Sequence, residues 1–177
     1  MTKSLLLAGF GGQGILFASK QIAACGMERG KNVTWLPSYG PESRGGTSNC
    51  SVIISDEEIG SPIVNKPDYL AAFNIPSFDK FINTVKPYGT VFVDSSLVNR
   101  ITDRDDLSVY YVPASTMAAN NNLAGAANVV MLGKIIAVTK LFTYGEFTEH
   151  MAASVPASRA AMIEKNKMAF DLGFYYK

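Results

Sequence analysis

The sequence predicts a three-layer α/β fold, in which helices cover both faces of one mostly parallel β-sheet. Short apolar runs of strand character alternate with segments whose apolar residues recur at three- and four-residue steps, as in amphipathic helices. Residues 48–64 depart from this alternation, because two strand-like runs follow one another and indicate an antiparallel hairpin within a mixed sheet. No repeat, linker or low-complexity segment divides the 177 residues, so we expect a single domain over residues 1–177.

The expected elements follow from these patterns and from the turn residues between them. Strands are expected at residues 5–8, 32–36, 50–55, 61–64, 69–73, 90–94 and 107–112. Helices are expected at residues 12–29, 76–85, 114–122, 125–139, 146–151 and 157–172, the third of these as a loose helix or loop. Pro37 is expected to end the second strand, because proline has no N–H to donate to a strand ladder.

A glycine-rich turn follows the first strand directly. Gly9, Gly11 and Gly14 have G-x-G-x-x-G spacing, and the first helical pattern begins at once. Such a Rossmann-like turn directs backbone N–H groups and the positive end of a helix toward a bound anion. The alternative is that these glycines only let the first helix pack tightly on the sheet.

A nicotinamide dinucleotide is disfavoured as the ligand of this turn. Its ribose needs an acidic residue about 20 residues further on, at the end of the second strand. That strand ends here in Pro37 and Ser38, whereas Glu28 lies inside the preceding helix and Glu42 lies beyond the strand.

The loop at residues 38–48 is the second candidate binding segment. It places Tyr39, Glu42 and Arg44 among glycines and small hydroxyl residues, a mixture suited to a polar ligand. The alternative is an ordinary surface loop with a local Glu42–Arg44 ion pair of little energetic value. Asp94 ends a later strand, where it either caps a turn or lines a cleft.

Composition excludes several classes of function. A formal net charge of +1 argues against nucleic-acid binding. Cys25 and Cys50 lie in apolar patterns and are expected to be reduced core thiols, and His150 is expected to be a partly exposed helical residue. We therefore expect no catalytic residue and no metal site in this chain. No signal peptide and no apolar stretch of about 20 residues is visible, so we expect a soluble, cytoplasmic protein without membrane contact.

Four segments resemble the gamma subunit of 2-oxoacid:ferredoxin (acceptor) oxidoreductases, most closely the 2-oxoglutarate branch. They are Ala8–Gly14, the Tyr-Gly-Pro-Glu-x-Arg-Gly-Gly stretch that follows Ser38, residues 54–63 with their Gly-Ser-Pro ending, and Asn128–Gly133. The resemblance implies a multi-subunit complex that oxidatively decarboxylates 2-oxoglutarate or a related 2-oxoacid to an acyl-CoA. It also implies that this chain is inactive on its own. Its partners would be the other subunits and, through the complex, ferredoxin or a similar electron acceptor.

The resemblance further implies that this chain alone binds no cofactor, while the complex uses thiamine diphosphate, iron–sulfur clusters and coenzyme A. This chain would help to form the coenzyme A side of the complex. The expected binding residues are Gly9, Gly11, Gly12, Gln13, Gly14, Ser38, Tyr39, Gly40, Arg44, Gly45 and Gly46. Two alternatives stay open: a free-standing dinucleotide-binding oxidoreductase, and a purely structural subunit. The isolated chain is expected to form a homodimer through the surface that normally meets a partner.

Overall fold

One mixed β-sheet runs through the molecule. The computed structural model describes residues 1–38 and 48–177. The strands are β1 (Thr2–Gly9), β2 (Asn32–Ser38), β3 (Ser48–Ser55), β4 (Tyr69–Ala72), β5 (Thr90–Asp94) and β6 (Ser108–Val112). Their order in the sheet is β2-β3-β1-β4-β5-β6. β3 is antiparallel to both of its neighbours, whereas β1, β4, β5 and β6 are mutually parallel.

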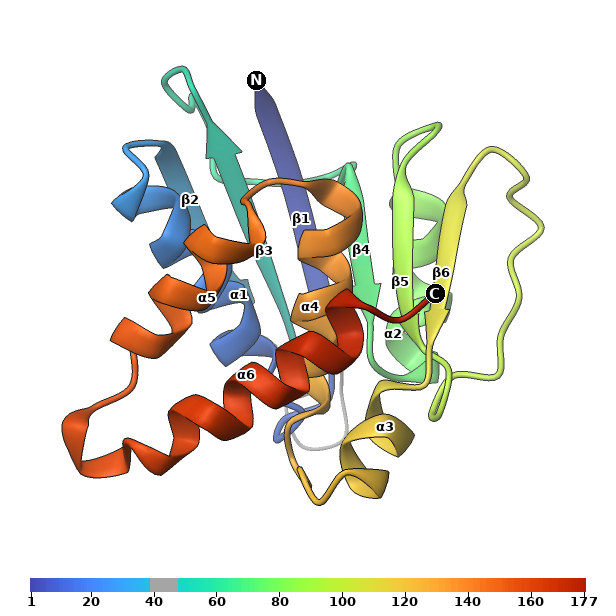
Figure 1. Ribbon diagram of the computed structural model, residues 1–177. Coiled ribbons are helices and arrows are strands. Elements are labelled where there is room, and N and C mark those ends of the chain that lie inside the picture. The colour runs from blue at the N-terminus through green and yellow to red at the C-terminus, as the bar shows by residue number, and fades with distance from the viewer. Residues whose placement is uncertain (39–47) are drawn as a thin grey trace.

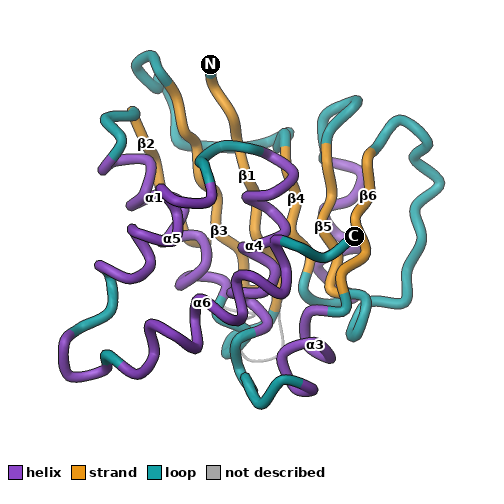
Figure 2. The backbone as a smooth tube through the Cα atoms, viewed as in Figure 1, coloured by secondary structure: helices purple, strands orange, loops and turns teal. Residues whose placement is uncertain are grey.

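Helices cover both faces of this sheet unequally, as Figures 1 and 2 show. They are α1 (Ile15–Glu28), α2 (Ile75–Phe81), η2 (Ile82–Thr84), α3 (Ala114–Asn120), α4 (Ala127–Thr139), α5 (Tyr144–Ala153), η3 (Ala157–Arg159) and α6 (Ala161–Phe174). α1 and α4 pack on one face, with α5 and α6 outside them, and α2 packs on the other. The predicted α/β class and mixed sheet are confirmed.

The alternation of side chains along β1 explains the two cores. Leu5 and Leu7 are buried in the cluster that includes α1 and α4, whereas Leu6 is buried with Phe78 and Ile82 on the opposite face. A strand that is buried on both faces has an unbroken run of apolar residues, and residues 5–8 form such a run here.

The closest helix contact lies between α4 and α6. A methyl group added at Gly133 would overlap the carbonyl oxygen of Phe170, and one added at Gly173 would overlap that of Val130. The two glycines therefore allow the two backbones to touch, which fixes α6 across α4.

Two expectations about the strands are wrong. Residues 61–64 form no strand, because both edges of β3 are already occupied by β1 and β2 and leave no edge for a return strand. The second strand also continues through Pro37, which pairs with Cys50, to Ser38. A proline is tolerated there because β2 is the edge strand, so its other side has no ladder to break.

His150 is buried, so the expectation of a partly exposed side chain is wrong as well. The residue lies on α5, which begins with a capping box formed by Thr143 and Glu146 and packs against α1. Its Nδ1 lies 2.8 Å from an oxygen of the Glu28 carboxylate, and its Nε2 is buried without a hydrogen-bond partner among the described residues.

None of the helices in residues 1–38 and 48–177 is both long enough and apolar enough to cross a bilayer.

Candidate functional site

The glycine turn lies at the edge of the sheet where β1, β4 and β5 end, at the bottom of Figure 1. After β1 the chain enters α1 on one face of the sheet, and after β4 it enters α2 on the opposite face. In open α/β sheets, such a reversal opens a crevice outside the carboxyl ends of the strands, where ligands bind. The sequence-predicted turn therefore lies at the topological switch point of the sheet.

The second candidate segment starts and finishes at the same edge. Ser38 is the last residue of β2 and pairs with Asn49, while Ser48 begins β3 and pairs with Gly9. Ser38 is separated from the glycine turn by β3. The other site residues predicted in this segment, Tyr39, Gly40, Arg44, Gly45 and Gly46, lie outside the described residues.

The side chain of Gln13 bridges the crevice between β1 and β4. Its Nε2 donates to the carbonyl oxygen of Phe73 at 2.9 Å, and its Oε1 accepts from the backbone N–H of Phe10 at 2.6 Å. The Nδ2 of Asn74 donates to the same Oε1 at 3.3 Å. Gln13 thus holds the glycine turn in shape, and one N–H of its amide remains for a ligand.

Asn74 was missed by sequence reasoning, although a signal for it exists. It precedes Ile75 and Pro76, an arrangement typical of a helix N-cap followed by a proline in the first turn. Its Oδ1 accepts from the backbone N–H of Ser77 at 2.8 Å, and the side chain is buried. One asparagine therefore begins α2 and ties that helix to the glycine turn.

Backbone conformation accounts for Gly12 and Gly14. Their φ angles are 92° and 74°, in the left-handed region that strains other residues. At Gly14 a Cβ would also overlap the amide of Asn128 on α4, whose Nδ2 donates to the Gly14 carbonyl oxygen at 3.3 Å. Asn128 belongs to the Asn128–Gly133 segment of the family resemblance, and here it fixes α4 to the turn.

Gly9 and Gly11 differ in what surrounds them. A side chain at Gly9 would crowd Gln13, Ile15 and Phe73. At Gly11 an added Cβ would meet no described atom within 4 Å, and its φ does not require glycine. Packing and conformation therefore explain the other glycines of the turn, whereas at Gly11 no described residue blocks the close approach of a ligand.

Backbone donors without an acceptor in the described part of the chain lie nearby, at the start of α1. Gly14 precedes α1 without any side-chain cap, and the first intrahelical bond runs from the N–H of Ala18 to Gly14. The backbone N–H groups of Ile15, Leu16 and Phe17 find no acceptor within residues 1–38 and 48–177. They point out of the positive end of α1, which favours an anionic group.

Two cavities border the turn and meet at Gly12. One of about 340 Å³ lies on the α1 side and is lined by Phe10, Gly11, Gly12, Gly14, Ile15, Leu16, Phe17 and Ser48. The other, of about 310 Å³, lies over the carboxyl ends of β4 and β5 and is lined by small residues together with Gln13, Phe73, Asp94 and Leu97. Their walls are mostly apolar, so a ligand here would combine an apolar body with an anion.

Asp94 lines the second cavity but uses its carboxylate within the protein. Its Oδ2 accepts from the Ser115 hydroxyl at 2.6 Å, and its Oδ1 accepts from the backbone N–H of Ser96 at 3.1 Å. The side chain is fully buried. The structure therefore assigns Asp94 both roles that its position allowed: it caps a turn and forms part of a cleft wall.

Among the described residues, this edge holds no cluster suited to metal binding. Across the described part of the chain, no three histidine, cysteine or acidic side chains are placed to hold a metal ion. Cys25 on α1 and Cys50 on β3 are buried as predicted, and burial raises the pKa of the Cys25 thiol to about 11. These two cysteines do not fit an iron–sulfur cluster, which needs several thiolates around one site.

Comparison with known proteins confirms the resemblance seen in the sequence. The family described as "Pyruvate ferredoxin/flavodoxin oxidoreductase" matches residues 4–176. The chain is 37% identical over 179 residues to the 2-oxoglutarate synthase subunit KorC of Methanocaldococcus jannaschii, covering 98% of this chain and 93% of that protein. It is 42% identical over 132 residues to the ketoisovalerate oxidoreductase subunit VorA of Methanothermobacter marburgensis, covering 75% of this chain. The match spans only 27% of VorA, so VorA is much the longer chain.

Solved structures agree with the fold. The keto/oxoacid ferredoxin oxidoreductase gamma subunit of Geobacter sulfurreducens superposes with a TM-score of 0.84 at 30% identity, covering 97% of this chain and 96% of that one. The 2-oxoglutarate:ferredoxin oxidoreductase of Magnetococcus marinus has the same fold, with a TM-score of 0.86 at 23% identity over 97% of this chain and 30% of its own. Because the family model matches residues 4–176, nearly the whole length of the chain, the chain belongs to the pyruvate ferredoxin/flavodoxin oxidoreductase family.

Proposed function

We propose that this chain is the gamma subunit of a multi-subunit 2-oxoacid:ferredoxin oxidoreductase. The complex would oxidatively decarboxylate 2-oxoglutarate, or a related 2-oxoacid, to its acyl-CoA and pass the electrons to ferredoxin or a similar acceptor in the cytoplasm. The observation that carries this proposal is the near end-to-end match to a relative named as a subunit of 2-oxoglutarate synthase. The match covers 98% of this chain and 93% of that relative.

Coenzyme A is the ligand that the glycine turn would approach within that complex. The uncapped start of α1 offers three N–H groups, and no described atom lies within 4 Å of an added Cβ at Gly11, so a phosphate would be able to come close to the backbone there. The neighbouring cavities have apolar walls that suit the rest of such a ligand. Ser38 and the segment that follows it would complete the approach, with Arg44 paired to a phosphate or to a partner's carboxylate.

Thiamine diphosphate and the iron–sulfur clusters would be held by the partner subunits. This chain's cysteines are two in number and buried in separate elements, which does not provide a cluster site. Decarboxylation and electron transfer would take place on those groups. The residues of this chain would bind and orient coenzyme A and exclude water from one side of the site.

The alternative of a free-standing dinucleotide oxidoreductase is disfavoured by the strand order. In a dinucleotide-binding fold, the strand that carries the ribose-binding acid lies directly beside the first strand. Here β3 lies between β2 and β1, and β2 ends in Ser38 rather than in an acid. A purely structural subunit is disfavoured by Gly11, where neither conformation nor a described neighbour requires glycine.

Purification through an affinity tag on this chain, from the cell that makes it, tests the proposal. We expect partner chains to be retained together with thiamine diphosphate and iron–sulfur absorbance. The complex should reduce ferredoxin when it receives coenzyme A and 2-oxoglutarate, with ketoisovalerate and pyruvate as comparison substrates. Recovery of the chain alone, or as a homodimer that binds NAD(P), would contradict it.

A further inference from the structure

An exposed arm of mixed apolar and charged residues projects from the body of the molecule at the start of α6. Residues 156–168, here named the α6 arm, include no buried side chain, whereas Ala169, Phe170 and Gly173 further along α6 are buried. In Figure 1 the arm extends at the lower left beyond the sheet. Ile163 and Asn166 of the arm are half-buried and its other side chains are exposed, so the arm buries little surface within the described chain.

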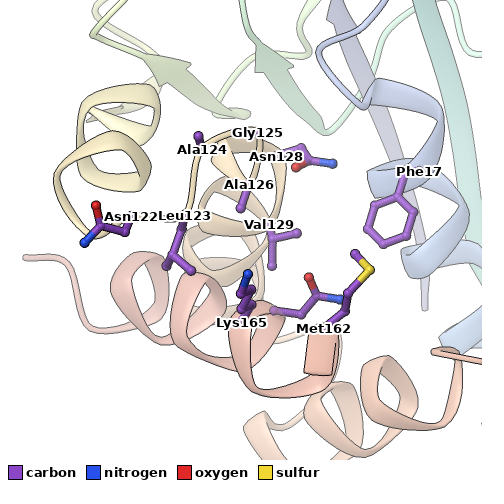
Figure 3. A pocket seen from close by; sticks show the side chains of 11 residues that line it. Phe17, Asn122, Leu123, Ala124, Gly125, Ala126, Asn128, Val129, Met162 and Lys165 are labelled. Atoms are coloured by element: carbon purple, nitrogen blue, oxygen red, sulfur yellow. The ribbon is translucent and has the colours of Figure 1, made fainter. Parts of the chain in front are cut away.

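A cavity of about 300 Å³ lies between the arm, the start of α4 and α1. Phe17, Leu123, Val129 and Met162 give it apolar walls, and Lys165 and Asn122 add polar groups. Figure 3 shows Met162 pointing toward the ring of Phe17 across the opening. Both side chains stay exposed, at 44% and 43%, although each is large and apolar. The cavity shares Phe17 with the cavity beside the glycine turn, so the two sites adjoin.

The charge of this cavity is positive. The amine of Lys165 has no carboxylate within 4.0 Å in the described part of the chain, whereas its neighbour Lys167 is paired with Asp171. The backbone N–H groups of Ala127 and Asn128, at the start of α4, also find no acceptor there. A segment that fits would insert an apolar side chain and place a carboxylate beside Lys165.

Relatives of different lengths indicate where such a segment comes from. In VorA and in the Magnetococcus enzyme, the part that matches this chain is only 27% and 30% of a longer polypeptide. In KorC it is nearly the whole chain. A domain that is covalently joined to its neighbour in some relatives needs a non-covalent docking surface where it is a separate chain.

We propose that the α6 arm and the cavity beneath it are the docking surface for a partner subunit of the oxidoreductase complex. The partner contributes an apolar side chain, which enters between Phe17 and Met162, next to an acidic residue, which pairs with Lys165. This inference rests on the proposed function and adds the surface through which the complex is held together.

Substitutions in the tagged complex test it. Met162→Glu and Lys165→Glu should each lower the amount of thiamine-diphosphate-bearing partner recovered by about tenfold, because each opposes one half of the docking chemistry. Met27→Glu is the matched control, since Met27 is also an exposed methionine but lies at the far end of α1. It should recover the partner as the wild type does. All three isolated variants should keep the wild-type melting temperature, because the altered side chains are exposed.

Photo-cross-linking from position 162 identifies the occupant directly. A benzophenone amino acid there should cross-link in the cell to the thiamine-diphosphate-bearing chain, and one at position 27 should not. Full recovery of partner by Met162→Glu, or a cross-link to a second copy of this chain, would overturn the docking surface while leaving the proposed function intact. Failure of the wild-type chain to retain any thiamine-diphosphate-bearing partner would overturn both.

Discussion

The amide nitrogen of Gln13 donates to the backbone carbonyl of Phe73 at 2.9 Å and so joins the glycine turn after β1 to the end of β4. Because β1 and β4 are adjacent and send their helices to opposite faces, this one side chain spans the switch point of the sheet. That bond helps to hold the shape of the candidate binding surface. The contribution of this hydrogen bond to the free energy of unfolding can be measured without any ligand.

Gln13→Ala should lower the free energy of unfolding by about 2 kcal/mol, because it leaves the Phe73 carbonyl and the Phe10 N–H without their partner. Gln13→Glu keeps the acceptor for Phe10 but cannot donate to Phe73, so it should also be destabilised at neutral pH. Urea unfolding of the isolated chain measures both. Wild-type stability in both variants would show that the bridge contributes nothing.

Gly14→Ala and Gly11→Ala should separate the structural glycines from the binding glycine. Alanine at position 14 should cost about 2 kcal/mol, because the positive φ is strained and the methyl group overlaps Asn128. Alanine at position 11 should change stability by less than about 0.5 kcal/mol. In the assembled complex, Gly11→Ala should raise the KM for coenzyme A about tenfold, since a methyl group would occupy the space of the approaching ligand.

A reversed pattern would contradict this division of roles. If Gly11→Ala unfolded the chain, packing would account for that glycine too. If it left the KM for coenzyme A unchanged, the turn would have no part in binding that ligand.

Gly173→Ala should destabilise the chain by about 3 kcal/mol, because its methyl group would overlap the Val130 backbone and push α6 off α4. Gly145→Ala is the control. Gly145 lies on α5, and no described atom lies within 4 Å of a Cβ added there. That variant should be neutral or more stable by up to about 1 kcal/mol. Thermal unfolding compares the two, and equal stability would show that the helices can move apart at no cost.

Asp68 should contribute stability that disappears in acid. Burial raises the pKa of its carboxyl, but hydrogen bonds from Ser4 and the ion pair with Lys86 outweigh burial and hold the pKa below its ordinary value. A depressed pKa in the folded state means that the stabilisation is complete above pH about 4 and is lost as the pH falls through the folded value.

The matching variant is Asp68→Asn, which should be about 1 kcal/mol less stable than the wild type at pH 7. Urea unfolding at several pH values from 7 down to 3 should show the difference shrinking below pH 4. A difference that stays constant over this range would mean that the charge of Asp68 does not stabilise the fold.

Sequence patterns predicted most of the fold because most of its information is local. The doubly buried run in β1, the period of α1 and the proline that opens α2 each depend on neighbours in the chain. The insertion of β3 between β2 and β1 was not predictable in this way, since strand pairing depends on residues far apart in sequence. The continuation of β2 through Pro37 was missed for the same reason, because its edge position is a property of the whole sheet.

The candidate site was predictable in place but not in detail. Glycine spacing located the turn correctly at the carboxyl edge, yet it could not distinguish Gly14, which packing against Asn128 requires, from Gly11, which nothing described requires. Gln13 is predicted to offer donors to a ligand, whereas the three hydrogen bonds that its side chain makes in the structure are within the protein. These differences arise from contacts with β4 and α4, over 50 residues away.

Depletion and re-addition of this chain tests the central claim most directly. The purified partner chains alone, this chain alone, and the two recombined should each be assayed for ferredoxin reduction that depends on both 2-oxoglutarate and coenzyme A. We expect turnover only after recombination, with the coenzyme A dependence restored by this chain. Turnover by this chain alone, or undiminished turnover by the partners without it, would contradict a gamma subunit that forms the coenzyme A side of a shared site.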